Sequence, residues 1–218
     1  NAESLYPTDL QWFSKIFVDL CGSNNIILDI GSGNGKLAIA MAKKGNVVTG
    51  LDVSKIAIQA AQEFHNKIAP DTPVGFKFGD ARELPFADNT FDYITSQDLV
   101  EHISENDFEV HLAEVYRVLK PRGRYVFWTP SELRGGSSLG LHLKEYTITE
   151  IDKIIRNTKF KYSWYDLRFY KIKLKIEVNQ SLMFPVILYE RFLSRIIKYL
   201  PESLNNLLVP RLLFKLTK

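Results

Sequence analysis

The chain has 218 residues, of which 45% are hydrophobic and 24% are charged, and its formal net charge is +3. This composition is typical of a globular domain large enough to bury a core, and the charge is too small to indicate a nucleic-acid partner. The single cysteine, Cys21, excludes an intramolecular disulfide, and no apolar run is long enough to predict a membrane-spanning helix. The first residues lack a basic stretch followed by an apolar one, so we expect a cytoplasmic location.

Short apolar runs alternate with amphipathic segments over most of the chain. The predicted strands are 25–30, 46–52, 74–78, 91–95 and 124–128, and the predicted helices are 8–20, 35–44, 54–67, 105–119 and 148–156. Strands that are apolar throughout and alternate with helices predict a parallel sheet with helices on both faces. Ligands bind such sheets beyond the carboxyl ends of the strands.

The pattern changes beyond residue 128. A long glycine-containing loop is predicted at 129–145, followed after the last helix of that set by strands 160–169 and 171–178. Residues 181–218 carry six basic and two acidic side chains, and they have the pattern of two amphipathic helices, 185–200 and 202–216. The sequence therefore predicts two units, a domain of residues 1–180 and a basic helical appendage of residues 181–218.

Three functions fit this predicted appendage. Its apolar stripes could pack on the body as a substrate lid, or they could contact a second copy of the chain in a dimer. A basic amphipathic hairpin could also lie on an anionic membrane surface. We therefore expect a monomer or homodimer, with peripheral membrane contact through residues 181–218 as one of the three alternatives.

A glycine-rich loop, Gly31-Ser32-Gly33-Asn34-Gly35, follows the first predicted strand. Glycines allow the chain to turn sharply from strand to helix and allow a ligand to approach the backbone closely. A dinucleotide-binding loop would have a third fingerprint glycine where this chain has Lys36. Asp29, just before the loop, would repel a pyrophosphate and would suit a ligand that carries an ammonium group and a sulfonium.

Acidic side chains follow the next two strands. Asp52 ends the second strand, where a carboxylate can accept hydrogen bonds from both hydroxyls of a ribose. Asp80 follows the third strand and can accept a hydrogen bond from the amino group of adenine. Helix capping beside Ser54 would also explain Asp52, and a turn would explain Asp80. Their occurrence at consecutive strand ends favours a ligand site.

These stretches resemble class I S-adenosylmethionine-dependent methyltransferases, nearest in motif to small-molecule O-methyltransferases of ubiquinone biosynthesis. The matching stretches are 28–35, 51–54, 79–81, 91–94 and 117–124, where Arg122 stands at a usual glycine. The resemblance implies an α/β, Rossmann-like, seven-stranded, mostly parallel sheet whose last strand is antiparallel, and S-adenosyl-L-methionine as the cofactor. The cofactor-binding residues that it implies are Asp29, Gly31, Ser32, Gly33, Asp52, Val53, Asp80, Ala81 and Gln97.

Two histidines are the candidate catalytic residues. His102 follows the fourth strand and His142 closes the long loop, and an imidazole near neutral pH can accept a proton from a hydroxyl acceptor. The string Asp98-Leu99-Val100-Glu101-His102 also resembles the Glu-x-x-Glu-His metal motif of some methyltransferases. Asp98 is one carbon shorter than glutamate, so we expect no metal.

The predicted function is methyl transfer from S-adenosyl-L-methionine to a small hydrophobic or amphiphilic acceptor, with a hydroxyl favoured. Three alternatives stay open: a cofactor-binding accessory protein without catalysis, a nicotinamide oxidoreductase, and an RNA methyltransferase. Asp29 and Lys36 disfavour the oxidoreductase, and the absence of a basic face with interleaved aromatics disfavours an RNA substrate.

Overall fold

The structure is a computed structural model that describes residues 14–130, 143, 144, 146–166 and 212–218. Its strands are β1 (Ile26–Ile30), β2 (Val47–Asp52), β3 (Val74–Phe78), β4 (Phe91–Gln97), β5 (Leu119–Thr129), β6 (Lys161–Asp166) and β7 (Leu212–Thr217). Its helices are α1 (Ser14–Cys21), α2 (Lys36–Lys43), α3 (Lys55–Ile68), α4 (Glu105–Val118) and α5 (Ile148–Arg156), with a 3-10 turn, η2 (Val100–His102), after β4.

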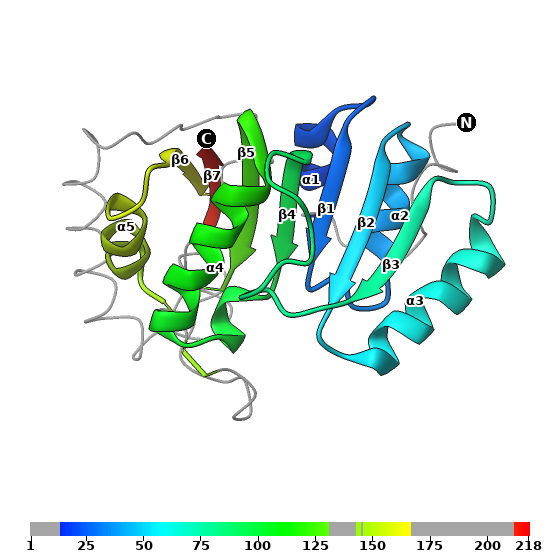
Figure 1. Cartoon of the computed structure of the whole chain (residues 1–218), viewed down its shortest axis with the longest axis horizontal. Helices are drawn as coiled ribbons and strands as arrows, with labels where there is room; N and C mark the ends of the chain where they lie inside the picture. Colours follow the sequence, from blue (N-terminus) through cyan, green and yellow to red (C-terminus); the bar gives the residue numbers. More distant parts are fainter. Residues whose placement is uncertain (1–13, 131–142, 145, 167–211) are drawn as a thin grey trace, which may run out of the picture.

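The seven strands form one sheet in the order β3-β2-β1-β4-β5-β7-β6. Strands β1 to β5 pair in parallel, whereas β7 lies antiparallel to both of its neighbours, β5 and β6. The arrowheads of β1 to β5 point to the same edge of the sheet (Figure 1). This confirms the predicted seven-stranded, mostly parallel α/β sheet and brings the ends of the first five strands together.

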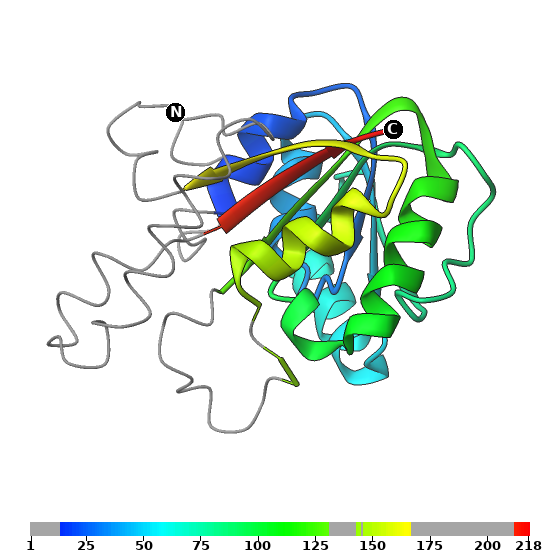
Figure 2. The ribbon, with the colours of Figure 1, turned by 90° about the vertical axis from the view of Figure 1, so that its left-hand side faces the viewer.

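Two hydrophobic cores lie on opposite faces of the sheet because successive residues of each strand point to opposite sides. On one face, Phe17 of α1 and Met41 of α2 belong to a buried cluster with Ile27 of β1. On the other, Phe108 of α4 belongs to a cluster with Leu28, the next residue of β1. Figure 2 shows the helices on both sides of the sheet. The central strands are therefore buried on both faces, as their continuous apolar runs predict.

Helix caps fix where the helices begin after the strands. The Ser54 hydroxyl accepts a hydrogen bond from the Ala57 N–H at 3.2 Å, which confirms the predicted start of α3 just after β2. Thr147 and Glu150 form a reciprocal capping box at α5, which confirms the predicted bounds of that helix. Such caps hold the turns at the carboxyl edge of the sheet in a defined conformation.

The predicted helix 202–216 is wrong for its last residues. Leu212–Thr217 form β7, and Leu213 is in register with both Trp128 of β5 and Tyr165 of β6. The end of the predicted 181–218 appendage therefore completes the sheet of the main domain. A run of leucines fits the periodicity of a helix as well as that of a strand, and pairing with β5 and β6 stabilises the strand. The predicted strand 171–178 and helix 185–200 lie outside the described residues.

No helix in the described part of the chain is both long enough and apolar enough to cross a membrane.

Candidate active site

A pocket of about 480 Å³ lies at the carboxyl ends of β1 to β4. It is enclosed by the turns that follow these strands and by the start of α4. The side chains and backbone that line it belong to Ile30, Gly31, Leu51, Asp52, Val53, Gly79, Asp80, Ala81, Arg82, Asp98, Leu99, His102, Ile103, Asp107 and Leu143. The predicted position of the site, beyond the strand ends, therefore coincides with a cavity.

The predicted cofactor residues divide into two groups. Those that line this pocket are Gly31, Asp52, Val53, Asp80 and Ala81. Asp29, Ser32, Gly33 and Gln97 lie next to it without lining it. The Gln97 side chain, for example, accepts a hydrogen bond from the Ser14 hydroxyl at 2.8 Å and so joins the start of α1 to the end of β4.

The glycine loop is tied to β2 through Asp52. Its carboxylate accepts a hydrogen bond from the Gly33 N–H at 2.9 Å through one oxygen and from the Ser54 N–H at 2.8 Å through the other. The Gly31 and Ser32 N–H groups both donate to the Leu51 carbonyl, at 2.8 and 3.0 Å. A single carboxylate therefore holds the loop after β1 and the turn after β2 in one arrangement at the pocket wall.

Asp29 lies beneath this loop rather than in the pocket. Its side chain is buried, and the Thr95 hydroxyl donates to it at 2.7 Å. Burial raises the pKa of Asp29 to about 7, and the nearby charge of Asp52 acts in the same direction. The expected direct contact of Asp29 with an ammonium group stays a prediction, since Asp29 does not line the cavity although its neighbour Ile30 does.

At the opposite wall of the pocket, Arg82 binds Asp80 and reaches Asp107 of α4. The guanidinium donates to Asp80 at 2.7 Å from Nη2 and at 3.0 Å from Nε, and to Asp107 at 3.3 Å. This hydrogen bonding holds the pKa of Asp80 below its usual range. Asp80 therefore stays ionised and oriented at the pocket by Arg82, a residue that was not among the predicted site residues.

The residues after β4 separate into a pocket side and a buried side. His102 is exposed and lines the pocket together with Asp98, whose backbone has a positive φ of 54°. Glu101 is buried, and its carboxylate accepts a hydrogen bond from the Thr129 hydroxyl at 3.0 Å. Burial and the neighbouring Asp98 raise the pKa of Glu101.

The predicted metal motif is not assembled within the part of the chain that the structure describes. No three His, Cys, Asp or Glu side chains there are placed to share a cation. His142 lies outside the described residues. The N–H groups of the two residues that follow it, Leu143 and Lys144, donate to the Glu101 carbonyl at 2.9 and 3.1 Å, so the loop returns to the body beside η2.

A methyltransferase-domain family model matches residues 27–123, which contain β1 to α4 and every pocket-lining residue except Leu143. The ubiquinone/menaquinone biosynthesis C-methyltransferase UbiE of Rickettsia typhi is 30% identical over 163 residues, which are 70% of this chain and 64% of that protein. Residues 27–123 of this chain form a class I S-adenosylmethionine-dependent methyltransferase domain.

Two further methyltransferases are similar to this chain. A ubiquinone biosynthesis O-methyltransferase of Alkalilimnicola ehrlichii is 36% identical over 124 residues, which are 56% of this chain and 48% of that protein. The structure of a Haemonchus contortus phosphoethanolamine N-methyltransferase in complex with S-adenosyl-L-methionine superposes with a TM-score of 0.67 at 20% identity, covering 99% of this chain and 55% of that one. The chain spans about two thirds or less of the length of these curated relatives.

The buried acid of this methyltransferase gives a testable pH dependence. The folded-state pKa of Asp29 is about 7, above the ordinary value of 3.8, so the folded protein binds this proton more tightly than the unfolded chain. The contribution of Asp29 to the free energy of unfolding should therefore fall as pH rises from about 4 to about 7 and stay constant above that. The loss is at most about 4 kcal/mol, since one pKa unit corresponds to about 1.4 kcal/mol.

Asp29→Asn removes the charge and keeps the shape. Urea unfolding at pH 4.5 and pH 8 should show that the variant gains stability relative to the unsubstituted protein at pH 8 and loses that advantage at pH 4.5. The surface substitution Asp71→Asn is the matched control, because Asp71 is exposed. An equal difference at both pH values would show that the charge on Asp29 is not the cause.

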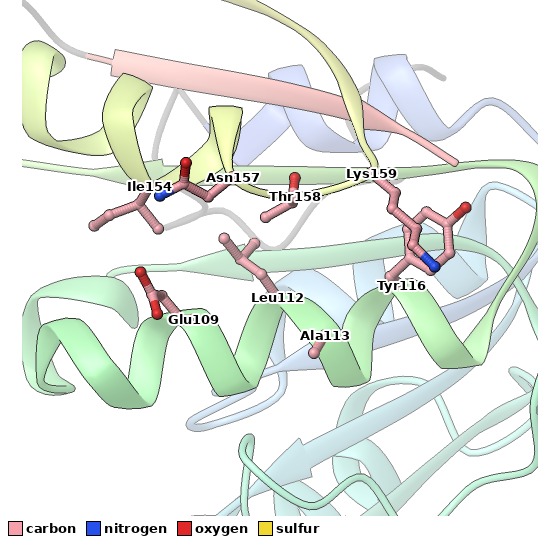
Figure 3. Close-up of a pocket in the computed structure, with 8 residues that line it drawn as sticks. All are labelled: Glu109, Leu112, Ala113, Tyr116, Ile154, Asn157, Thr158 and Lys159. Carbon is pink, nitrogen blue, oxygen red and sulfur yellow. The ribbon is translucent and has the colours of Figure 1, made fainter.

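A second cavity, of about 380 Å³, lies between α4 and α5 on the outside of the domain (Figure 3). It is lined by Glu109, Leu112, Ala113, Tyr116, Ile154, Asn157, Thr158 and Lys159. None of these residues lies at the carboxyl ends of β1 to β4, and none belongs to the matched motifs. The larger pocket is therefore the candidate active site of this methyltransferase domain.

Proposed function

We propose that this protein transfers a methyl group from S-adenosyl-L-methionine to a small hydrophobic or amphiphilic acceptor, with the cofactor in the 480 Å³ pocket. The observation that carries the proposal is the position of Asp52, which lies at the pocket wall between the glycine loop and the start of α3. Each of its oxygens accepts one backbone hydrogen bond and retains a lone pair. Two ribose hydroxyls can occupy these remaining lone pairs.

The charge of the pocket supports a cationic donor. Four carboxylates, those of Asp52, Asp80, Asp98 and Asp107, line the cavity with one guanidinium, that of Arg82. Such a wall attracts the sulfonium and ammonium groups of S-adenosyl-L-methionine and repels the pyrophosphate of a nicotinamide dinucleotide. The pocket thus favours the methyl donor over the alternative cofactor.

The chemistry requires mainly alignment. A lone pair of the acceptor attacks the methyl carbon in line with the departing sulfur, the carbon–sulfur bond breaks, and the neutral thioether S-adenosylhomocysteine leaves. Holding the two reactants in this geometry can contribute roughly 7–11 kcal/mol to the lowering of the barrier. For a hydroxyl acceptor a proton must also be lost, and we propose that the imidazole of His102, at the pocket wall, accepts it. A similar role for His142 stays a prediction.

The names of the relatives support the acceptor class. They include a ubiquinone/menaquinone biosynthesis C-methyltransferase and a ubiquinone biosynthesis O-methyltransferase, and a quinone is a substituted hydrophobic ring. We propose O-methylation of a hydroxyl on such a ring. A hydroxyl must lose a proton, which His102 at the pocket wall can accept, whereas many other acceptors need no general base.

Calorimetric titration with S-adenosyl-L-methionine, S-adenosylhomocysteine and NAD⁺ tests the cofactor. The first two should bind at one site and NAD⁺ should not. Turnover is then measured as transfer of tritium from methyl-labelled cofactor to a panel of alkyl-substituted phenols and catechols. Binding without transfer to any of them, or to cell extract, would favour the accessory-protein alternative.

The role of His102 is tested on the acceptor identified in this way. His102→Ala should lower kcat by about 10²- to 10⁴-fold, as expected for loss of a general base, and should leave the affinity for S-adenosylhomocysteine within about twofold. The lost rate should recover partly at high pH, where the acceptor hydroxyl ionises without help. A kcat that equals that of the unsubstituted enzyme would remove this assignment.

A further inference from the structure

A buried chain of polar side chains leads from the middle of the sheet to the wall of the pocket. Its members are Ser96 of β4, Tyr125 of β5 and His111 of α4, and all three have an exposed fraction of 0%. The Ser96 and Tyr125 hydroxyl oxygens are 2.7 Å apart, and His111 Nε2 lies 2.9 Å from the tyrosine oxygen. His111 Nδ1 lies 2.9 Å from the Ala81 carbonyl oxygen. The sequence gives no sign of this chain beyond a histidine on the buried face of α4.

The partners of His111 fix where each proton lies. A carbonyl oxygen can only accept, so Nδ1 carries the proton and donates to Ala81. Burial lowers the pKa of His111 to about 4, so the ring is neutral at neutral pH and Nε2 accepts. The hydroxyl of Tyr125 must therefore donate to Nε2, and its oxygen accepts from Ser96. Every hydrogen bond of the chain is thus directed from β4 toward the loop after β3.

The chain ends on a peptide unit that also holds Asp80. The carbonyl of the Ala81–Arg82 peptide accepts from His111, and the N–H of the same unit, which points the opposite way, donates to Asp80 Oδ1 at 2.8 Å. Because a peptide unit is planar, a bond at its carbonyl end fixes the direction of its N–H end. His111 is therefore linked to the Asp80 carboxylate through this peptide unit, in addition to the guanidinium of Arg82 that binds the carboxylate directly.

We propose that His111 is a positioning residue that holds the Asp80–Ala81–Arg82 turn in the geometry that recognises the amino group of the adenine ring. The inference rests on the proposed function, since it assumes that the adenosyl cofactor occupies the pocket that Asp80 and Ala81 line. It assigns to the Ser96–Tyr125–His111 chain a role in base selectivity rather than in chemistry. The hydrogen bond that joins His111 to the pocket-lining turn goes to this backbone unit.

The test compares two substitutions of His111, each of which can retain one of the two hydrogen bonds made by the imidazole. In His111→Asn the side-chain amide can occupy the place of Nδ1 and donate to the Ala81 carbonyl, whereas the contact with Tyr125 is lost. In His111→Gln the longer side chain can reach Tyr125, whereas the bond to Ala81 is lost. Both variants keep a neutral polar group in a buried place, so the difference between them compares loss of the Ala81 bond with loss of the Tyr125 bond.

The probes are S-adenosylhomocysteine and S-inosylhomocysteine, in which an oxo group replaces the adenine amino group and N1 carries a proton, so that both edge positions near Asp80 and Ala81 change from the adenine pattern. We expect His111→Gln to weaken S-adenosylhomocysteine binding about fivefold to tenfold, the equivalent of one neutral hydrogen bond, and to leave S-inosylhomocysteine within about twofold. His111→Asn keeps the bond to Ala81 and loses only the contact with Tyr125, so the preference for the adenosyl ligand should fall by no more than about twofold to threefold, as expected from loss of that contact. A role only in folding would instead lower the affinities for both ligands in parallel with the melting temperature.

Tyr125→Phe provides a second variant that keeps the aromatic packing if His111→Gln does not fold. It removes the donor to Nε2 and should shift the preference in the same direction by about twofold to threefold. The inference would be overturned if the ratio of the affinities for the adenosyl and inosyl ligands were unchanged in His111→Gln and Tyr125→Phe. It would also be overturned if this ratio fell equally in His111→Asn and His111→Gln. If the unsubstituted protein binds neither nucleoside, the proposed function is wrong and the inference fails with it.

Discussion

Replacement of Asp52 by alanine should weaken S-adenosyl-L-methionine binding by at least about 10²-fold. Two ribose hydroxyls would lose a charged acceptor, and a hydrogen bond to a charged group contributes about 1.5–3 kcal/mol. The substitution also removes the acceptor of the Gly33 and Ser54 N–H groups, so the glycine loop loses its attachment to β2. The two effects act on the same ligand, and the loss of affinity should exceed that from any other single pocket carboxylate.

Isothermal titration with S-adenosylhomocysteine measures this loss. Asp52→Asn separates the two effects, because an amide keeps one acceptor for the loop and lacks the charge for the ribose. It should fall between alanine and the unsubstituted protein. Asp71→Ala, at an exposed acid between α3 and β3, is the control and should bind normally. Full affinity in Asp52→Ala would exclude a ribose at this pocket wall.

Gly35→Ala should lower the free energy of unfolding by about 2–5 kcal/mol. The backbone of Gly35 has a φ of 76°, which costs a residue with a Cβ about 1–2 kcal/mol. A Cβ there would also lie 2.5 Å from Phe76 Cζ and 2.7 Å from Phe76 Cε1, and such overpacking costs about 1–3 kcal/mol more. The start of α2 would have to move away from β3, which distorts the turn that forms the pocket.

Urea unfolding of Gly35→Ala and Gly22→Ala separates backbone strain from overpacking. Gly22 has a similar φ of 64°, but the nearest atom to its Cβ would be 4.0 Å away. Gly22→Ala should therefore show only the backbone cost, about 1–2 kcal/mol. Equal losses in the two variants would mean that Phe76 moves aside without cost.

The first five strands and the helices between them could be predicted because their signals are local. The apolar run of β1 and the cap at Ser54 lie within a few residues of the structure that they determine. β7 could not be predicted in the same way. The leucines of residues 202–216 fit a helical period, but Leu213 and Phe214 are buried between β5 and β6, partners that lie far away in the sequence. Pairing with strands that are distant in the sequence therefore makes this segment a strand rather than a helix.

The sequence predicted which residues form much of the candidate site, but it predicted their arrangement only in part. Consecutive strand ends identified Asp52 and Asp80 because parallel strands bring their carboxyl ends together. The same reasoning could not show that Asp29 lies beneath the loop, since one position along a strand changes the face. His111 was missed because its partners, Ala81 and Tyr125, come from two other elements.

The pairing of β6 with β7 determines where the sheet can accept insertions. Asp166 and Leu212 are register partners in adjacent strands, so the two ends of the intervening chain are neighbours whatever its length. Doubling the length of a flexible connection between fixed ends costs only about 0.6 kcal/mol. Insertions between these two residues should therefore cost the sheet little, and the pocket at the ends of β1 to β4, on other strands of the sheet, should keep its lining.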